Sequence, residues 1–383
     1  MSDIARAPLP VFTYVILPDF LSCVVIAFGF PLWIRLLSFV AYMYGVYAGM
    51  HFTTGDPLQD YSIGSFLSGQ IVMAIHFLVL LNLVDDVRHE RDTFQKSARE
   101  MPFYRRVYWA ACYTHFPRSV GWSNQVSSIP PRLRVSRSAF VRSRLQWILW
   151  FWLVLDVAQT YQHTHPLFHF SGDATRSVGS EGNIMRSINV IAYMATPYSI
   201  LNLQYNVCSV VAVLVGYSDP ADWPDLFGKW ADAYTIRKFW GRSWHQLLRR
   251  NCSSAGRFVS TKFGFKSGTL GSSYTQLYVV FILSGIMHLG GDFMMYPSAL
   301  DVSFTYFILQ AIAITAEDAI VGLGKRVGIK ESGVTHALGY ISTFVWLSWS
   351  TTAYIDGALK AGTGRTEALP FSLSRTVIGL FEY

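Results

Sequence analysis

Charged side chains are scarce in this sequence. Asp, Glu, Lys and Arg together make up 14% of its 383 residues, against about 25% in soluble globular domains. A soluble chain of this length needs more charge on its surface and polar linkers between its domains. Instead, 51% of the residues are hydrophobic, and they form long runs separated by basic segments. This pattern excludes a disordered protein, a coiled coil and a secreted disulfide scaffold, and it indicates a helical membrane protein.

Cysteine is rare as well. The four cysteines are scattered without a CxxC spacing, so neither a zinc motif nor a disulfide framework follows from them. We expect them to be reduced packing residues rather than reactive ones. The sequence also lacks the GxGxxG, Walker, GxSxG and HExxH patterns. A membrane di-iron enzyme needs a large histidine cluster, and most of the ten histidines here are isolated.

Eight apolar stretches are long enough to span a membrane, because a bilayer core about 30 Å thick takes roughly 20 residues as a helix. They are residues 10–29, 32–50, 63–84, 145–162, 185–215, 274–297, 302–323 and 334–356. We therefore predict an all-α polytopic integral membrane protein with about eight transmembrane helices, and residues 1–383 as a single membrane domain. The 185–215 stretch is long enough to be tilted, and Pro197 favours a break in it.

Lysine and arginine concentrate in two segments between the apolar stretches. Residues 85–144 carry 12 of them and residues 216–273 carry nine, whereas residues 51–62 and 163–184 carry almost none. Because Lys and Arg mark the cytoplasmic side of a membrane, the two basic segments are predicted to be cytosolic loops. Three spans before the first loop and eight in total place both termini on the lumenal side, with the endoplasmic reticulum as the expected membrane. This distribution accounts for the net charge of +7 without a nucleic-acid partner.

One histidine lies within an otherwise apolar predicted span. His288 belongs to the 274–297 stretch, and ionisable residues inside a membrane are functional candidates because they are costly to bury. A neutral imidazole there can accept a proton at neutral pH, although a core histidine bonded to a neighbouring helix is the alternative. Asp292 follows four residues later on the same helical face. It either supports the imidazole or lies in water at the lumenal end of the helix.

Aromatic and cationic residues alternate in the second basic loop. From Tyr234 to Arg250 they follow the pattern of an amphipathic helix at the membrane interface, which predicts Arg242 and Arg249 on one face with His245. Two interpretations fit: a cradle for a phosphorylated ligand such as coenzyme A, or an anchor in the headgroup layer. The candidate residues are Trp240, Arg242, Trp244, His245, Gln246, Arg249 and Arg250.

Three histidines cluster in the lumenal segment, at His163, His165 and His169. Metal binding and plain interfacial polarity both fit this spacing. Since no carboxylate spacing accompanies the cluster, we predict no metal site.

Further ionisable residues lie in or near the predicted spans. Glu317 and Asp318, near the cytosolic end of the 302–323 stretch, are either solvated, paired with arginine or part of a site. His76 and Asp156 each stand alone in a span and are interpreted as interhelical hydrogen-bonding groups.

Two segments together resemble the membrane-bound O-acyltransferase superfamily, specifically its wax synthase-like branch. Lys238–Arg250 is similar to an FW-x-R-x-WHQ-like motif in a cytosolic loop of that family, and Ser284–Gly290 is similar to its later S-G-x-x-H helix. His245 and His288 stand 43 positions apart in this sequence.

Two weaker matches extend the resemblance over residues 105–350. Arg118–Trp122 is similar to the family's RGIGW stretch, with Ser119 in place of the glycine at its second position. Phe307–Asp318 is similar to a span with the pattern F-x-x-Q…E-D.

The resemblance implies transfer of an acyl group from acyl-CoA to the hydroxyl of a lipophilic alcohol, without a bound cofactor. By this analogy His288 removes the alcohol's proton and His245 polarises the thioester carbonyl or positions the donor. The loop residues bind the donor, and Asp292, Gln310 and Glu317 support the site. Many filamentous-fungal members resemble O-acetyltransferases of terpenoids or steroids, so acetyl-CoA is the expected donor.

Other functions remain open on the sequence alone. A long-chain wax ester synthase fits the same motifs. An integral-membrane terpene cyclase would use buried carboxylates such as Glu317, Asp318 and Asp156 as acids. A transporter or non-catalytic scaffold fits the spans and loops but gives no reason for the paired histidine motifs. The sequence does not predict the oligomeric state.

Overall fold

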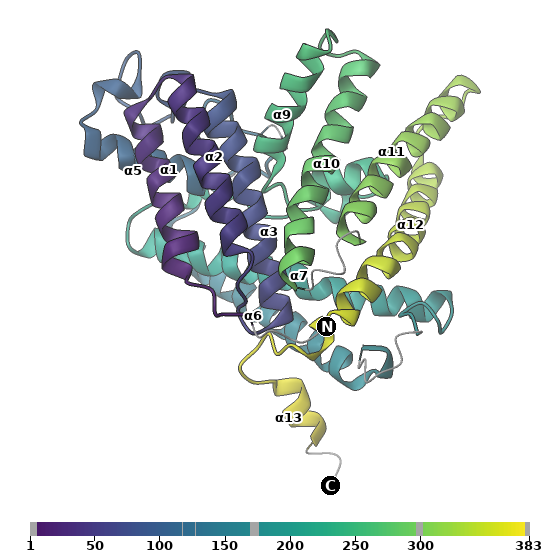
Figure 1. Cartoon of the computed structure of the whole chain (residues 1–383). Coiled ribbons are helices and arrows are strands. Elements are labelled where there is room, and N and C mark those ends of the chain that lie inside the picture. Colours follow the sequence, from purple (N-terminus) through teal and green to yellow (C-terminus); the bar gives the residue numbers. More distant parts are fainter. Residues whose placement is uncertain (1–5, 117, 127, 169–175, 296–301, 380–383) are drawn as a thin grey trace. The chain divides into compact units, whose positions relative to one another are not determined.

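The structure is a computed structural model that describes residues 6–116, 118–126, 128–168, 176–295 and 302–379 (Figure 1). Within these ranges the regular secondary structure is helical, and no β-strand is present. A helix, or a pair of consecutive helical segments, occupies each of the eight predicted apolar stretches. The prediction of an all-α protein is therefore confirmed.

Residue contacts divide the chain into two compact units. The first unit comprises residues 1–128 and 246–322, and the second comprises residues 129–245 and 323–383. The first unit contains α1 (Leu17–Phe28), α2 (Leu32–Gly49), α3 (Pro57–Ala74), α4 (Leu83–Asp86), α5 (Phe103–His115), α9 (Arg249–Lys262), α10 (Leu270–Met295) and most of α11 (Val302–Arg326). The second unit contains α6 (Arg137–Thr164), α7 (Asn183–Leu214), α8 (Ile236–Lys238), α12 (Gly333–Lys360) and α13 (Leu373–Gly379).

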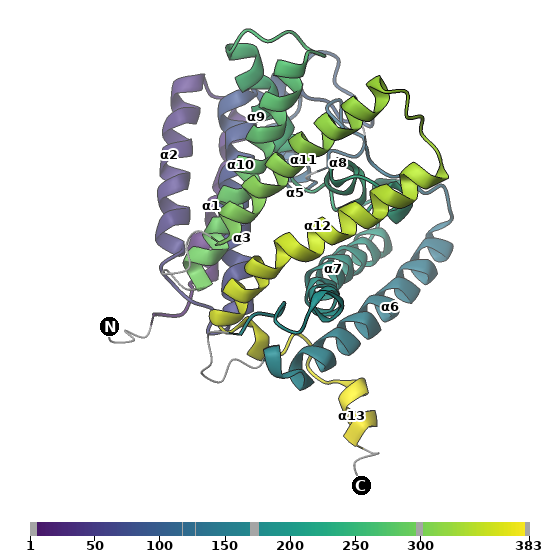
Figure 2. The same cartoon turned by 90° about the vertical axis from the view of Figure 1, so that its right-hand side faces the viewer.

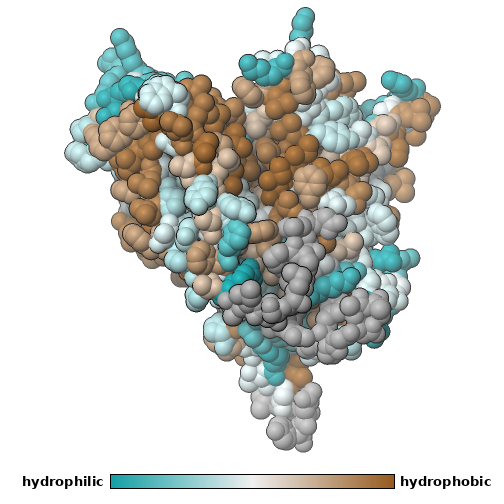
Figure 3. Space-filling view, viewed as in Figure 1, coloured by the Kyte–Doolittle hydropathy of each residue, from teal (hydrophilic) through white to brown (hydrophobic). Residues whose placement is uncertain are grey.

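Four helices of the described chain are long and apolar enough to cross a membrane. They are Leu32–Gly49, Pro57–Leu80, Leu270–Met295 and Val302–Arg326, and Phe12–Phe28 is a shorter apolar helix. In Leu32–Gly49 only 11% of the apolar window is buried inside the protein. Apolar side chains accordingly cover the outer faces of α1 and α2 (Figure 3). An exposed apolar face of this extent needs lipid around it, so the chain is a helical membrane protein.

Small residues allow α3 and α10 to pack closely in the first unit. A methyl group on Gly290 would overlap Ser68 Oγ and lie 2.7 Å from the Gly64 carbonyl oxygen. A methyl group on Gly291 would lie 2.7 Å from the Tyr61 side chain. Because glycine carries no Cβ, the two backbones approach each other here, as small residues permit between membrane helices. This contact brings the start of α3 against the part of α10 that carries His288.

The second unit is organised around α6 and α7, which lie side by side (Figure 2). Arg144, which is 4% exposed, joins them: its guanidinium donates to Asn206 Oδ1 (3.1 Å), Asp225 Oδ1 (2.9 Å) and the Trp223 carbonyl oxygen (2.7 Å). Pro197 lies inside α7, which continues through it to Leu214. The break that this proline favours in the sequence is absent, and α7 is one helix.

Candidate active site

His288 lies in α10 with one ring nitrogen engaged by a tyrosine. Its Nδ1 is 2.9 Å from the hydroxyl oxygen of Tyr61 in α3. On α11 the ring of Phe307 stacks on the imidazole, with 4.6 Å between centroids and 13° between planes. The side chain is half-buried. Contacts on two sides hold the imidazole in one orientation, as a general base requires.

Asp292 lies one turn beyond His288 and is only 3% exposed. Its two oxygens accept hydrogen bonds from one residue of α11: the backbone N–H of Ser303 (3.1 Å) and the Ser303 hydroxyl (2.7 Å). The interpretation of Asp292 as a residue in water at the helix end is therefore wrong, because the start of α11 covers it. Its carboxylate instead belongs to the surroundings of His288.

The two other predicted supporting residues lie further along α11. Gln310 is fully buried, and its amide donates to the Tyr306 carbonyl oxygen over 3.3 Å. Glu317 follows two helical turns later and is half-buried. Its neighbour Asp318 accepts a hydrogen bond of 3.2 Å from the Tyr274 hydroxyl. Gln310 thus lies one turn from Phe307, whereas Glu317 is at the far part of the helix.

The second basic loop is not a continuous helix. After α8 a π-helical turn, Phe239–Ser243, ends at Trp244, whose backbone is extended. The turn packs against Gly228, where any methyl group would overlap the Arg242 carbonyl oxygen. The predicted amphipathic helix from Tyr234 to Arg250 is therefore wrong. Backbone hydrogen bonds in this segment close the π turn and join Ser243 to Gly228, and a separate helix, α9, begins at Arg249.

One consequence concerns the predicted cationic face. Arg242 belongs to the π turn of the second unit, whereas Arg249 opens α9 in the first unit. They do not share a helical face with His245, because no helix connects them. The prediction of a common face is wrong.

The loop places its aromatic residues in a cluster within the second unit. Trp244 contacts the rings of Phe239 (5.7 Å between centroids) and Trp240 (6.0 Å). Phe227 lies edge-on to both Trp244 (5.2 Å) and His245 (5.8 Å). His245 therefore lies against this aromatic cluster, and it is the last residue of the 129–245 segment of its unit.

Gln246 and the two arginines that follow belong to the first unit. Gln246 is 4% exposed, and its Oε1 accepts from Arg249 Nη1 over 2.8 Å. Arg250 is 3% exposed; its Nη1 donates to Ser119 Oγ (2.8 Å) and to the Phe116 carbonyl oxygen (3.2 Å). Burial lowers the pKa of this guanidinium. Arg250 is thus packed into the protein, unlike its neighbour Arg249.

Ser119, the residue that departs from the family pattern, has a left-handed backbone with φ of 53°. Only glycine adopts this conformation without steric cost. In this chain the serine supplies a hydroxyl to the buried Arg250. The structure therefore gives a reason both for glycine in the family pattern and for serine here.

The remaining ionisable candidates have separate partners. His76 Nε2 is 2.8 Å from the Tyr113 hydroxyl, and Asp156 accepts the backbone N–H of Ser374 (2.8 Å). Both interhelical interpretations are confirmed.

Two histidines of the 163–184 segment face carboxylates: His163 faces Glu367 and His165 faces Glu181, each over 3.3 Å. His169 lies outside the described residues. Within the described ranges, no three His, Cys, Asp or Glu side chains are grouped to hold a metal ion.

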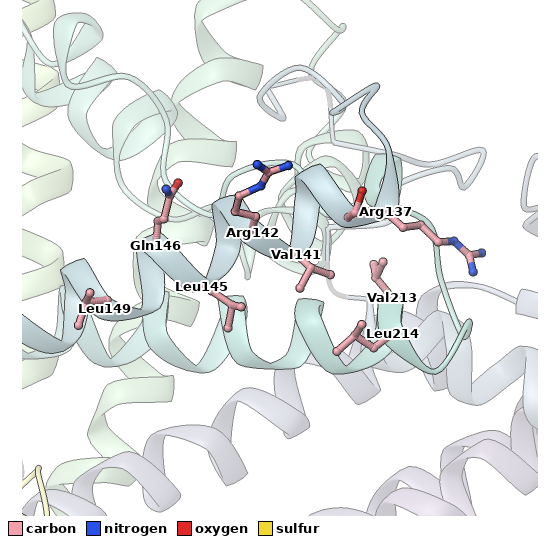
Figure 4. A pocket seen from close by; sticks show the side chains of 9 residues that line it. Arg137, Val141, Arg142, Leu145, Gln146, Leu149, Val213 and Leu214 are labelled. Carbon is pink, nitrogen blue, oxygen red and sulfur yellow. The ribbon is translucent and has the colours of Figure 1, made fainter.

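A groove of about 740 Å³ lies in the second unit, between α6 and α7 (Figure 4). Val141, Leu145 and Val213 line it, together with Arg137 and Arg142. None of the predicted site residues belongs to this groove, so it does not mark the proposed chemistry.

Sequence analysis missed three residues around His288: Tyr61, Ser303 and Phe307 as a stacking partner. Tyr61 is 227 positions away in the sequence, so spacing alone did not connect it with the histidine. A signal was present in the small residues Gly64, Ser68, Gly290 and Gly291, whose pattern indicates a close helix contact.

Comparison with protein families and curated proteins gives consistent matches. The Membrane bound O-acyl transferase family matches residues 223–309, which include both histidine motifs. The Aspirochlorine biosynthesis protein F C-terminal domain matches residues 136–214. Acetyltransferase ple2 of Rhodocybe pseudopiperita is 33% identical over 339 residues, covering 86% of this chain and 85% of that protein.

Two further relatives cover most of the chain. Acetyltransferase eriL of Hericium erinaceus is 29% identical over 337 residues, which are 86% of each protein. The O-mevalon transferase yanI of Aspergillus niger is 28% identical over 332 residues, covering 78% of this chain and 72% of that protein.

Proposed function

The chain belongs to the membrane-bound O-acyltransferase family and is an acyltransferase of fungal secondary metabolism, and on this premise we propose that it acetylates the hydroxyl of a lipophilic alcohol with acetyl-CoA. The acceptor class we propose is a terpenoid or steroid alcohol. The observation that carries the chemistry is His288, an imidazole among apolar helices, oriented by Tyr61 and Phe307.

In the proposed reaction His288 takes the proton of the acceptor hydroxyl. The alcohol oxygen attacks the thioester carbonyl carbon, the new C–O bond forms, and the C–S bond of acetyl-CoA breaks. The leaving thiolate of coenzyme A takes the proton from the imidazolium, so that the enzyme returns to its starting state. We assign to His245 the polarisation of the thioester carbonyl. No acyl-enzyme is needed.

We propose that the donor binds along the second basic loop. Trp240, Arg242, Trp244, Gln246 and Arg249 are the loop residues that we propose to contact it. The phosphates of coenzyme A suit arginine, which holds them through charge-assisted hydrogen bonds. Arg250 takes an indirect part, because its contacts with Phe116 and Ser119 fix the start of α9, next to Arg249.

We propose that the helical segments at all eight predicted apolar stretches cross the membrane of the endoplasmic reticulum, as a single membrane domain. In this arrangement residues 85–144 and 216–273 are cytosolic, and both termini and residues 163–184 are lumenal. Single cysteines introduced into a background lacking the four native cysteines report the side by membrane-impermeant labelling. Labelling of 216–273 from the lumen would separate the donor loop from cytosolic acetyl-CoA and overturn this topology.

The function is tested in yeast microsomes that contain the full chain. Radiolabelled acetyl-CoA is offered with a panel of alcohols that includes farnesol and ergosterol, and products are identified by mass spectrometry. We expect the gain of one acetyl group on at least one alcohol, absent from microsomes without the protein. Transfer of a long-chain acyl group but not of acetyl would favour a wax ester synthase. Acetyl-CoA-independent cyclisation of a polyprenyl substrate would favour a terpene cyclase.

A further inference from the structure

Four polar groups of the first unit follow one another from a carboxylate to His288. The Ser303 hydroxyl lies 2.7 Å from Asp292 Oδ1. The Tyr61 hydroxyl lies 3.4 Å from Ser303 Oγ and 2.9 Å from His288 Nδ1. The groups come from three helices, α3, α10 and α11, so tertiary packing alone assembles this row.

The carboxylate at one end determines the direction of the hydrogen bonds. An ionised Asp292 can only accept, so the single hydroxyl proton of Ser303 points to Asp292. Ser303 Oγ is then an acceptor toward Tyr61, so the Tyr61 hydroxyl can donate to it. The Tyr61 oxygen is left to accept from the other side, where it faces His288 Nδ1.

From this polarity we infer that Asp292, Ser303 and Tyr61 are positioning residues that keep the proton of His288 on Nδ1 and leave the Nε2 lone pair as the base. The inference rests on the proposed function, since a base is needed only if His288 deprotonates an acceptor. A neutral imidazole has one protonated nitrogen, and the partner of that nitrogen selects which one it is. The reverse tautomer would carry its proton on Nε2 and could not accept one there.

The backbone contact between Ser303 and Asp292 makes the direction of these hydrogen bonds testable. Asp292 Oδ2 accepts the Ser303 backbone N–H over 3.1 Å. In Asp292→Asn the amide oxygen must take this position, because only an oxygen can accept. The amide nitrogen then faces Ser303 Oγ and donates to it. The Ser303 proton turns to Tyr61, the Tyr61 proton turns to His288 Nδ1, and the whole row is reversed.

Two variants and their combination therefore separate polarity from structural support. Asp292→Asn is expected to lower kcat about 100-fold or more, the range of a lost general base, with the KM for acetyl-CoA unchanged. Tyr61→Phe removes the hydroxyl beside His288 without reversing the row, and it is expected to lower kcat about tenfold, the equivalent of one hydrogen bond. In Asp292→Asn/Tyr61→Phe no hydroxyl remains beside His288 Nδ1 to be turned, so kcat is expected to rise to the level of Tyr61→Phe.

A purely structural role predicts the opposite pattern. Losses would then accumulate, and the double variant would be no more active than Asp292→Asn; that result overturns the inference. Tyr278→Phe is the matched control, because it removes a hydroxyl contact between α10 and α11, 3.3 Å from Thr315 Oγ1, outside the row. It is expected to keep the wild-type kcat.

The assay uses full-length protein in microsomes, with acetyl-CoA and the panel alcohol that the wild type acetylates fastest. If Asp292→Asn does not accumulate, Ser303→Ala replaces it, because without the serine oxygen the Tyr61 proton turns to His288 Nδ1. Its kcat is expected to fall below that of Tyr61→Phe, and wild-type kcat in both variants contradicts the positioning role. Absence of transfer by the wild type contradicts the proposed function itself. Transfer by the wild type with equal kcat in all variants contradicts the positioning role alone.

Discussion

The first unit contains two histidine–tyrosine pairs of nearly equal length. His288 lies 2.9 Å from the Tyr61 hydroxyl, and His76 lies 2.8 Å from the Tyr113 hydroxyl. They differ in what lies behind the tyrosine. Behind Tyr61 is Ser303, which donates its proton to the Asp292 carboxylate. Behind Tyr113 is the Asn124 side chain, whose amide nitrogen donates to the Tyr113 oxygen over 2.7 Å.

On the polarity inferred above, the two rows run in opposite directions. Asn124 donates to Tyr113, so the Tyr113 oxygen is an acceptor there and its own proton can occupy the lone pair of His76 Nε2. His76 is also 2% exposed, whereas His288 is half-buried. A neighbouring tyrosine alone therefore does not make a histidine a base. We propose that the group behind the tyrosine, an acceptor or a donor, decides whether the histidine can act as one.

The largest expected difference is between His288→Ala and His76→Ala. Loss of a general base lowers kcat by about 10²–10⁴-fold, so His288→Ala is expected to bind acetyl-CoA but not to turn over. His76→Ala is expected to keep the kcat of the folded fraction while losing about 2–5 kcal/mol of stability, from a core cavity and the lost hydrogen bond between His76 and Tyr113. Turnover per folded molecule and thermal unfolding in detergent measure the two effects. Full activity of His288→Ala would remove the proposed base.

The next effect concerns the helix contact that brings Tyr61 to His288. Gly291→Ala places a methyl group 2.7 Å from the Tyr61 side chain, and overpacking of this kind costs about 1–3 kcal/mol. We expect a lower unfolding temperature together with a lower kcat, because Tyr61 must move. Gly322→Ala in α11 is the control, since a methyl group there meets nothing within 4 Å. Equal behaviour of the two variants would show that the close contact does not position Tyr61.

Arg249 and Arg250, adjacent at the start of α9, are expected to differ in whether their loss affects donor binding or stability. Arg249→Ala is expected to raise the KM for acetyl-CoA about tenfold, the equivalent of one charge-assisted phosphate contact, without a change in KM for the alcohol. Arg242→Ala is expected to raise the KM for acetyl-CoA in the same way. Arg250 lies over the Tyr113 ring, 4.3 Å from its centroid, so Arg250→Ala should lower stability rather than donor affinity. If Arg249→Ala leaves the KM for acetyl-CoA unchanged, the donor loop is misassigned.

The positions of the helices could be predicted from the sequence, because each apolar run carries its own signal. Local signals failed in the second basic loop, where the aromatic and basic spacing of Tyr234–Arg250 imitates a helix. The segment Phe239–Ser243 instead forms a π turn that packs against Gly228, a residue outside the predicted helix. His288 could be singled out because an ionisable residue stands out in an apolar span. Its partners Tyr61 and Ser303 could not, since ordinary residues acquire that role only through packing of three helices.

The smallest expected effect lies at Ser119, which supports the second pair through Arg250. Two changes separate its two contributions. Ser119→Gly relieves the left-handed backbone at φ 53°, worth about 1–2 kcal/mol, but it loses the hydrogen bond to the guanidinium, worth about 1.5–3 kcal/mol. These terms nearly cancel, so we expect an unfolding temperature close to that of the wild type. Ser119→Ala keeps the strain and loses the hydrogen bond, so it should unfold at a lower temperature than Ser119→Gly. If alanine is tolerated as well as glycine, the hydroxyl contributes nothing to Arg250. In that case the hydrogen bond to Arg250 does not explain why this chain has serine where the family pattern has glycine.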